Sequence, residues 1–164
     1  MSYSKVVYAS PIGPLTLVER SGALCGVILK TMWPTFAKRF TPAADRVTPV
    51  LKTTTRQLDE YFAGKRRSFD LPLELSGTVF QKKAWGALAG IPYGTTKTYR
   101  EQAQAIRSPK AFRAVGHANG LNPFCIVLPC HRVVGSDGSL TGYAGGLEAK
   151  RFLLALEGSK LGGK

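Results

Sequence analysis

Histidine and acidic residues are scarce in this chain of 164 residues, which contains 2 His and 10 Asp and Glu. It carries 23 Lys and Arg, so the formal net charge is +13 and the isoelectric point is near 10.0. This imbalance excludes an acidic surface and favours a polyanionic partner. The alternative is a basic surface kept for solubility, because the basic residues are spread along the chain rather than gathered in one tail.

Long apolar runs, closely spaced cysteine pairs and internal repeats are also lacking. No apolar run reaches the roughly 18 residues of a membrane helix, and the first residues, MSYSKVVYAS, lack the apolar segment of a signal peptide. Three cysteines without close pairing fit a reducing compartment. We therefore expect a cytoplasmic protein, or a nuclear one if the cell has a nucleus, with no membrane partner.

Metal-ligand spacings are missing as well. The Cys and His residues occur in neither a C-x-x-C nor an H-x-x-x-H spacing, so we expect no structural zinc and no cofactor. These residues are Cys25, Cys125, Cys130, His117 and His131.

Residues 1–75 have the pattern of a small α/β domain. Short Val- and Leu-rich segments at 5–10, 15–20 and 23–30, separated by turn signals, predict an antiparallel meander. A helix is predicted from Pro49 to Gly64, and FDLPLEL at 69–75 predicts an edge strand or an extended linker. Residues 31–46 fit no pattern.

Residues 76–164 predict a second, mainly helical domain. Thr78 with Gln81, and Thr98 with Glu101, form capping-box patterns that predict helices over 79–89 and 99–106. Ser108 followed by Pro109 predicts a third helix over 109–118, stopped by Asn119 and Gly120. A last helix is predicted over 147–157, with Gly158 as its stop.

The helices over 99–106 and 109–118 have the outline of a helix-turn-helix, although plain helical bundles contain similar pairs. The second of them is rich in small residues, which suit either close helix packing or entry into a groove narrower than the major groove. These residues are Ala111, Ala114, Gly116, Ala118 and Gly120, and they accompany the basic Lys110 and Arg113.

The stretch IVLPCHRVVG places a thiol beside an imidazole where a predicted buried strand ends at Pro129. A nucleophilic cysteine needs a proton acceptor, and His131 could accept the proton of Cys130 through a water. Glu157 shares the buried side of its predicted helix and is the candidate carboxylate for orienting His131; alternatively it reaches solvent or pairs with Lys150 or Lys160. Cys25 and Cys125 lie in apolar runs and are predicted to be core residues.

Four stretches follow one another in the order and spacing of a known family: FQKKAWGALAGIPYGTTKTY, RAVGHANGLNP, IVLPCHRVVGSDGSLTGYAGG and KRFLLALEG. The chain thereby resembles the O6-alkylguanine-DNA alkyltransferases, also called methylated-DNA–protein-cysteine methyltransferases. The resemblance implies an N-terminal α/β domain with ribonuclease H topology and a helical domain with a winged-helix-like helix-turn-helix. It also implies a suicide repair protein, in which Cys130 takes the alkyl group from O6 of guanine in duplex DNA; the residues do not decide whether O4 of alkylthymine is a second substrate.

Roles for individual residues follow from the same resemblance. His131, Glu157 and a water would activate Cys130, and Asn122 would brace the turn beside it. Tyr99 would help to rotate the nucleotide out of the duplex and would then protonate the guanine that leaves.

The resemblance also implies a DNA-binding helix and a base pocket. Arg113 would replace the extruded nucleotide in the stack, and the helix would bind the minor groove through Lys110, Ala111, Ala114, Gly116, Asn119 and Gly120. The carbonyls of Cys130 and Val133 would read the guanine amine, and the N–H of Ala144 would reach O6. Tyr143 and Lys150 would line the pocket.

The expected partner is double-stranded DNA containing O6-alkylguanine, bound by a monomer that could assemble cooperatively along DNA. Two other classes of protein compete with this interpretation. One is a non-catalytic alkyltransferase-like protein, in which another residue replaces the nucleophile, so that Cys130 itself argues against it. The other is a helix-turn-helix regulator with a structural cysteine, which would leave Cys130, His131 and Glu157 unexplained.

Overall fold

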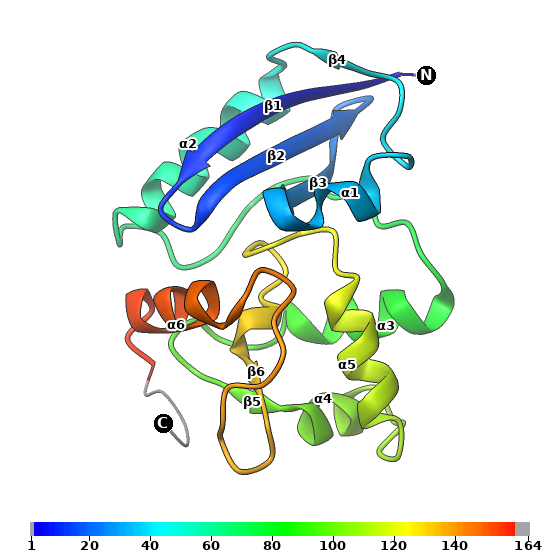
Figure 1. The fold of residues 1–164 in the computed structure, drawn as a ribbon, viewed down its shortest axis with the longest axis vertical. Helices are drawn as coiled ribbons and strands as arrows, with labels where there is room; N and C mark the ends of the chain where they lie inside the picture. Colours follow the sequence, from blue (N-terminus) through cyan, green and yellow to red (C-terminus); the bar gives the residue numbers. More distant parts are fainter. Residues whose placement is uncertain (1, 160–164) are drawn as a thin grey trace. The chain divides into compact units, whose positions relative to one another are not determined.

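The computed structural model describes residues 2–159, which form two compact units (Figure 1). Unit 1 is built from the chain up to Leu75 together with Pro123–Val127, and unit 2 from Ser76–Asn122 and the chain from Leu128 onward. Within the described residues, no helix is long and apolar enough to cross a membrane.

Unit 1 contains a four-stranded sheet in the order β3-β2-β1-β4 (Figure 1). Its strands are β1 (Tyr3–Ser10), β2 (Gly13–Arg20), β3 (Ala23–Leu29) and β4 (Ala43–Asp45). The first three pair antiparallel, which confirms the predicted meander, whereas β4 runs parallel to the start of β1 and was not expected. Short parallel strands such as β4 have little local signal, because their pairing partner is distant in sequence.

The segment after β3, for which the sequence has no pattern, forms an aromatic cluster on the sheet. A 3₁₀ turn (Lys30–Met32) leads into helix α1 (Trp33–Phe36). Phe36 and Phe40 are buried against residues of β2 and β3, among them Cys25. Cys25 is therefore a core residue, as predicted.

Helix α2 (Pro49–Phe62) packs on strands β1, β2 and β3. Thr48 is its N-cap, and the Thr48 hydroxyl accepts a hydrogen bond from the Leu51 N–H at 3.4 Å. Gly64 has φ +75°, a left-handed conformation suited to glycine just beyond a helix end. The predicted helix is confirmed with both of its end signals.

The segment FDLPLEL is extended and forms a single bridge to β3 rather than a full strand. The N–H of Leu24 donates to the carbonyl of Pro72 at 2.7 Å, and the N–H of Glu74 donates to the carbonyl of Leu24 at 2.8 Å. Pro72 lacks an N–H, so it can only accept at this edge.

Unit 2 is built on four helices: α3 (Val79–Leu88), α4 (Tyr99–Ala105), α5 (Phe112–Gly120) and α6 (Leu147–Leu156). Helices α3 and α4 both begin with complete capping boxes, which confirms the two predicted starts. Helices α4 and α5 contact each other and α3, so the helix-turn-helix pair packs as one cluster (Figure 1). Helix α6 begins at its predicted residue and ends one residue earlier than predicted, with Glu157 as its C-cap, and Gly158 follows with φ +76°.

The predicted start and end of α5 are wrong. Pro109 does not open the helix, because Ser108–Ala111 form a turn in which the Ala111 N–H donates to the Ser108 carbonyl at 2.8 Å. The fixed φ of proline suits the second position of a β-turn as well as the first turn of a helix. Asn119 and Gly120 do not stop α5 but complete it.

The predicted buried strand ahead of Pro129 is also wrong. Phe124 makes one parallel bridge to Val27, and Ile126 has φ +71°, which breaks any continuous strand. The run is apolar because it is buried in a loop, where Cys125 is 7% exposed and thus a core residue as predicted. Burial, rather than strand pairing, explains this composition.

Polar side chains between α3, α4 and α5 are paired within the cluster. Gln102 and Asn119 exchange amide hydrogen bonds at 2.8 and 2.9 Å, and Gln102 also donates to the Ala84 carbonyl at 3.0 Å. The Trp85 indole N–H donates to the Ala118 carbonyl at 2.8 Å. These bonds fix α5 against α3 and α4.

We expect Asn119→Ala to lower the free energy of unfolding by about 1–3 kcal/mol, because it leaves the buried Gln102 amide without its partner. Urea unfolding followed by circular dichroism measures this loss. Gln104→Ala, at an exposed position of α4, is the control and should change the value by less than about 0.5 kcal/mol. Equal effects of the two substitutions would contradict the structural role of the pair.

Candidate active site around Cys130

Cys130 opens a 3₁₀ turn (Cys130–Arg132) directly after Pro129. Strand β6 (Val133–Val134) follows at once and pairs parallel with β5 (Lys97–Thr98). Since Tyr99 comes directly after β5, this short pairing brings the start of α4 next to the cysteine turn. The chain therefore turns at Pro129, as the interpretation of the Cys-His pair requires.

Cys130 is half-buried and lines a cavity of about 480 Å³ within unit 2. One wall of the cavity comes from the loop after β6, at Thr141, Gly142, Tyr143 and Ala144. The remaining wall comes from the start of α4 and from one side of α5, at Tyr99, Gly116, Asn119 and Gly120. A thiol thus faces a space large enough for a planar heterocycle.

Burial raises the pKa of the Cys130 thiol, and hydrogen bonds and a nearby positive charge act against that rise. The Asn122 side chain hydrogen-bonds to the thiol, and the positive charge of Lys150 favours the thiolate. Asn122 also donates from Nδ2 to the Leu128 carbonyl at 2.8 Å, which holds the chain that leads into Pro129. The thiol therefore needs a base to become a nucleophile.

His131, the residue after Cys130, forms a fully buried pair with Glu157. His131 Nε2 lies 2.8 Å from Glu157 Oε2, and both side chains have 0% exposure. Burial lowers the pKa of His131, although Glu157 acts in the opposite direction. Because a carboxylate can only accept, Nε2 carries the hydrogen, and Nδ1 remains an acceptor with no hydrogen-bond partner among the described residues.

Arg132 is the second partner of Glu157, a role that was not predicted from the sequence. Its Nε donates to Oε1 at 2.8 Å and its Nη2 to Oε2 at 2.9 Å, while Nη1 donates to the Ile91 carbonyl at 2.7 Å. The Tyr93 ring lies 5.6 Å from the guanidinium carbon. A basic residue next to His131 is the signal that could have suggested it, because a buried carboxylate needs a compensating cation.

The alternative placement of Glu157 at a solvated helix end is therefore wrong, because Glu157 is only 5% exposed. It does not pair with Lys150, whose contacts lie elsewhere, and Lys160 lies outside the described residues. Glu157 is the C-cap of α6, where the helix dipole disfavours an anion, so Arg132 and His131 supply the compensating contacts.

Lys150 lies in α6 with no exposed surface, and its ammonium group holds the loop after β6. Nζ donates to the carbonyls of Val133 at 2.6 Å, Thr141 at 2.9 Å and Gly142 at 3.5 Å. Burial lowers the pKa of Lys150 to about 8. Lys150 and Val133 thus lie behind the cavity wall instead of lining it, unlike Tyr143 and Ala144.

Tyr99 closes the cavity from the side of α4. Its hydroxyl donates to the carbonyls of Thr141 at 3.3 Å and Gly142 at 3.4 Å. Burial raises the pKa of Tyr99, so the phenol stays protonated near neutral pH. A protonated phenol at the cavity wall can donate a proton to a bound group.

The residues of α5 and of the turn before it that were predicted to bind DNA differ in their exposure to solvent. Lys110, Arg113 and Ala114 are exposed, and Ala111, Gly116 and Gly120 are half-exposed. Asn119 is buried and bonded to Gln102, so its side chain supports the helix.

An aromatic side chain that the sequence analysis did not consider lies beside Arg113. The guanidinium carbon of Arg100 is 4.2 Å from the centre of the Phe112 ring, and that of Arg113 is 5.9 Å from it. Phe112 thus connects the first turn of α4 to the exposed arginine of α5. In the described part of the chain, no group of three or more Cys, His, Asp or Glu side chains is arranged to hold a metal ion.

Two family models match the chain and together cover most of it. Residues 4–75 match the ribonuclease-like domain of 6-O-methylguanine DNA methyltransferase, and residues 79–159 match the DNA-binding domain of the same protein. The predicted fold class, an α/β domain followed by a helical DNA-binding domain, is thereby confirmed.

Relatives and solved structures agree with these models. A methylated-DNA–protein-cysteine methyltransferase of Methanosarcina barkeri is 49% identical over 94% of this chain and 97% of its own. One from Mycobacterium tuberculosis is 45% identical over 92% of this chain and 90% of its own. The crystal structure of Mycobacterium tuberculosis OGT in complex with DNA has a TM-score of 0.85 and 43% identity, covering 96% of this chain and 93% of that one. The chain therefore belongs to the 6-O-methylguanine DNA methyltransferase family.

Proposed function

We propose that this protein repairs DNA directly, by transferring the alkyl group from O6 of guanine in duplex DNA to its own Cys130. The observation that carries the proposal is Cys130 at the wall of a base-sized cavity, followed in the chain by His131, which is paired with the buried Glu157. In the reaction a C–S bond forms while the bond from the alkyl carbon to O6 breaks. The product is a thioether, so each molecule acts once.

His131 is the group that takes the proton of Cys130. Its Nδ1 is a free acceptor because Nε2 donates to Glu157, and a water between Sγ and Nδ1 would carry the proton. The imidazolium that forms is stabilised by the carboxylate of Glu157. Arg132 holds that carboxylate through two hydrogen bonds and so fixes its orientation.

Tyr99 supplies the proton that the departing guanine needs. Its hydroxyl is at the cavity wall and remains protonated, as the raised pKa requires. The carbonyl of Cys130 and the N–H of Ala144, both at residues that line the cavity, would bind the edge of the guanine, and the carbonyl of Val133 would reach it from behind the wall. The Val133 carbonyl already accepts from Lys150, so its second lone pair is the one available for the base.

Duplex DNA is the partner, and helix α5 is the element that binds it. The minor groove is only about 6 Å wide. On the accessible side of α5, Ala114 and Gly116 have little or no side chain, so the helix backbone can come close to a narrow groove. The net charge of +13 favours the phosphate backbone. The cavity can accept a base only when the base leaves the stack, and Arg113 would fill the gap.

A non-catalytic lesion-binding protein is the alternative function, and Cys130 argues against it. A protein that acts on chromosomal DNA is expected where that DNA is, in the cytoplasm of a cell without a nucleus or in the nucleus of a eukaryotic cell.

Cys130→Ser should abolish alkyl transfer while duplex binding stays within about twofold, because a hydroxyl is far less ionised than a thiol at neutral pH. Mass spectrometry after incubation with duplex O6-methylguanine DNA measures the transfer, as the gain of one methyl group on Cys130. Cys125→Ser is the matched control and should still gain the methyl group. An unchanged mass of the native protein would support the non-catalytic alternative instead.

Glu157→Gln should slow labelling by a benzylguanine substrate by about 10²-fold, because the imidazolium loses its counter-charge. The pH at which the labelling rate is half-maximal should also move upward, since the thiolate becomes harder to form. Glu148→Gln, at an exposed position of the same helix, is the control. Circular dichroism separates this effect from unfolding, and an unchanged pH profile in a folded variant would contradict the role of Glu157.

Arg113→Ala should impair repair of duplex DNA far more than reaction with free benzylguanine, because the free base needs no extrusion. We expect a loss of about 10- to 100-fold on the duplex, which corresponds to a few kcal/mol of unstacking. A mismatched base opposite the lesion should restore part of the rate. Equal losses on both substrates would show that Arg113 supports the fold or the cavity instead of the flipped state.

A further inference from the structure

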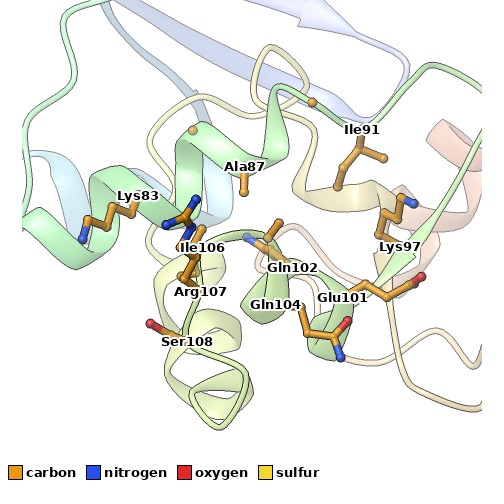
Figure 2. Close-up of a pocket in the computed structure, with 13 residues that line it drawn as sticks. Lys83, Ala87, Ile91, Lys97, Glu101, Gln102, Gln104, Ile106, Arg107 and Ser108 are labelled. Atoms are coloured by element: carbon orange, nitrogen blue, oxygen red, sulfur yellow. The ribbon is translucent and has the colours of Figure 1, made fainter.

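A second and larger pocket, of about 1010 Å³, lies within unit 2 between helices α3 and α4 (Figure 2). It shares no lining residue with the Cys130 cavity, and the proposed alkyl transfer does not use it. Its walls are the α3 side at Lys83 and Ala87, the α4 side at Gln104, and the turn at Arg107 (Figure 2). It is an open groove rather than an enclosed cavity.

Part of the groove lining, here called its floor, is apolar. Ala87, Ala105 and Ile106 contribute aliphatic surface that is half-exposed or exposed, whereas Ile91 is nearly buried, at 4% exposure. Gly86 has no side chain, and a Cβ at this position would meet no atom within 4 Å. The groove therefore has room for a side chain next to Gly86. Apolar side chains of a partner would bury surface here that a sugar-phosphate backbone could not.

The rim of the groove is basic. Lys83 lies at one end and Lys97 at the other, and Arg107 lies at the turn after α4 (Figure 2). All three are exposed, and no ion pair within residues 2–159 involves them. Their charges are therefore available to a ligand.

One acidic side chain, Glu101, also lines the groove. Its Oε1 accepts the N–H of Thr98 at 2.8 Å in the capping box of α4. It would repel an anion placed directly over the first turn of α4. A ligand with separated negative charges can contact the three cations and avoid that point.

We propose that this groove binds an acidic amphipathic segment of another protein, with apolar side chains on the floor and carboxylates at Lys83, Lys97 and Arg107. Charge complementarity selects this occupant. A second copy of the chain is a poor match, because 23 basic residues face only 10 acidic ones. The phosphates of a nucleic acid could pair with the basic side chains of the rim, but its backbone has no apolar groups to bury against the floor. Such a contact would bring the repair protein to a partner without blocking the Cys130 cavity.

The test uses the full-length protein and a set of fluorescein-labelled 16-residue peptides. Each peptide has Leu or Phe at positions i, i+3, i+4 and i+7 and Asp or Glu elsewhere. Fluorescence anisotropy should show saturable binding of at least one peptide at micromolar concentrations. Poly-glutamate of equal length is the matched probe without apolar anchors and should bind at least tenfold more weakly.

Two variants locate the binding in the groove. The double variant Lys83→Glu with Lys97→Glu reverses two charges of the rim and should weaken peptide binding by at least tenfold. Gly86→Leu places a side chain where the apolar anchors of the peptide would lie and should weaken binding by at least tenfold as well. Lys52→Glu with Lys65→Glu, at exposed positions of unit 1, gives the same change of net charge and should reduce binding by less than threefold. Labelling of Cys130 by benzylguanine is measured in every variant and should stay unchanged, so that failure of the groove proposal is separable from failure of the alkyl-transfer proposal.

Several outcomes would overturn the proposal. Equal binding of poly-glutamate would mean that only the net charge attracts the peptides. Displacement of the peptide by undamaged duplex DNA, together with equal loss of DNA and peptide binding in the rim variant, would assign the groove to nucleic acid. Absence of binding by every peptide in the set would show that the groove does not take such segments.

Discussion

The site depends on the hydrogen bonds that the buried carboxylate of Glu157 makes with two neighbouring side chains. The carboxylate is held by His131 on one side and by the guanidinium of Arg132 on the other. A carboxylate with no exposed side-chain surface is stable only with such partners. The same contacts fix the imidazole so that its unpaired nitrogen, Nδ1, is left as an acceptor. They also attach the end of α6 to the turn that carries Cys130.

A second set of contacts shapes the cavity in front of the thiol. Lys150 ties the loop at Thr141 and Gly142 to the carbonyl of Val133, and Tyr99 donates to the same loop from the other side. Lys150 is buried and Tyr99 is half-buried, and carbonyl groups accept from both, so the loop that lines the Cys130 cavity has a defined position. The cavity is therefore built by polar groups that lie mostly behind its wall, and the surface left for a base is small and specific.

Local signals predicted the helices well wherever a cap determines where they begin. Thr78 with Gln81 and Thr98 with Glu101 mark helix starts correctly, because a capping box satisfies backbone donors within four residues of sequence. Pro109 misled the prediction of α5, because a proline fits a turn and a helix start equally well. The apolar run before Pro129 misled in a similar way, because burial in a loop and burial in a strand select the same residue types.

The sequence by itself determined the meander, most helices, the candidate nucleophile and its neighbouring histidine, because each of these depends on residues close together in the chain. It also identified Glu157 as a carboxylate on the buried side of its helix. Only the tertiary structure decided that Arg132 shares this carboxylate, that Lys150 holds a loop from behind the cavity, and that Asn119 pairs with Gln102. These contacts join residues that are distant in sequence, and hydrogen-bond partners of that kind are fixed by packing, which no local pattern encodes.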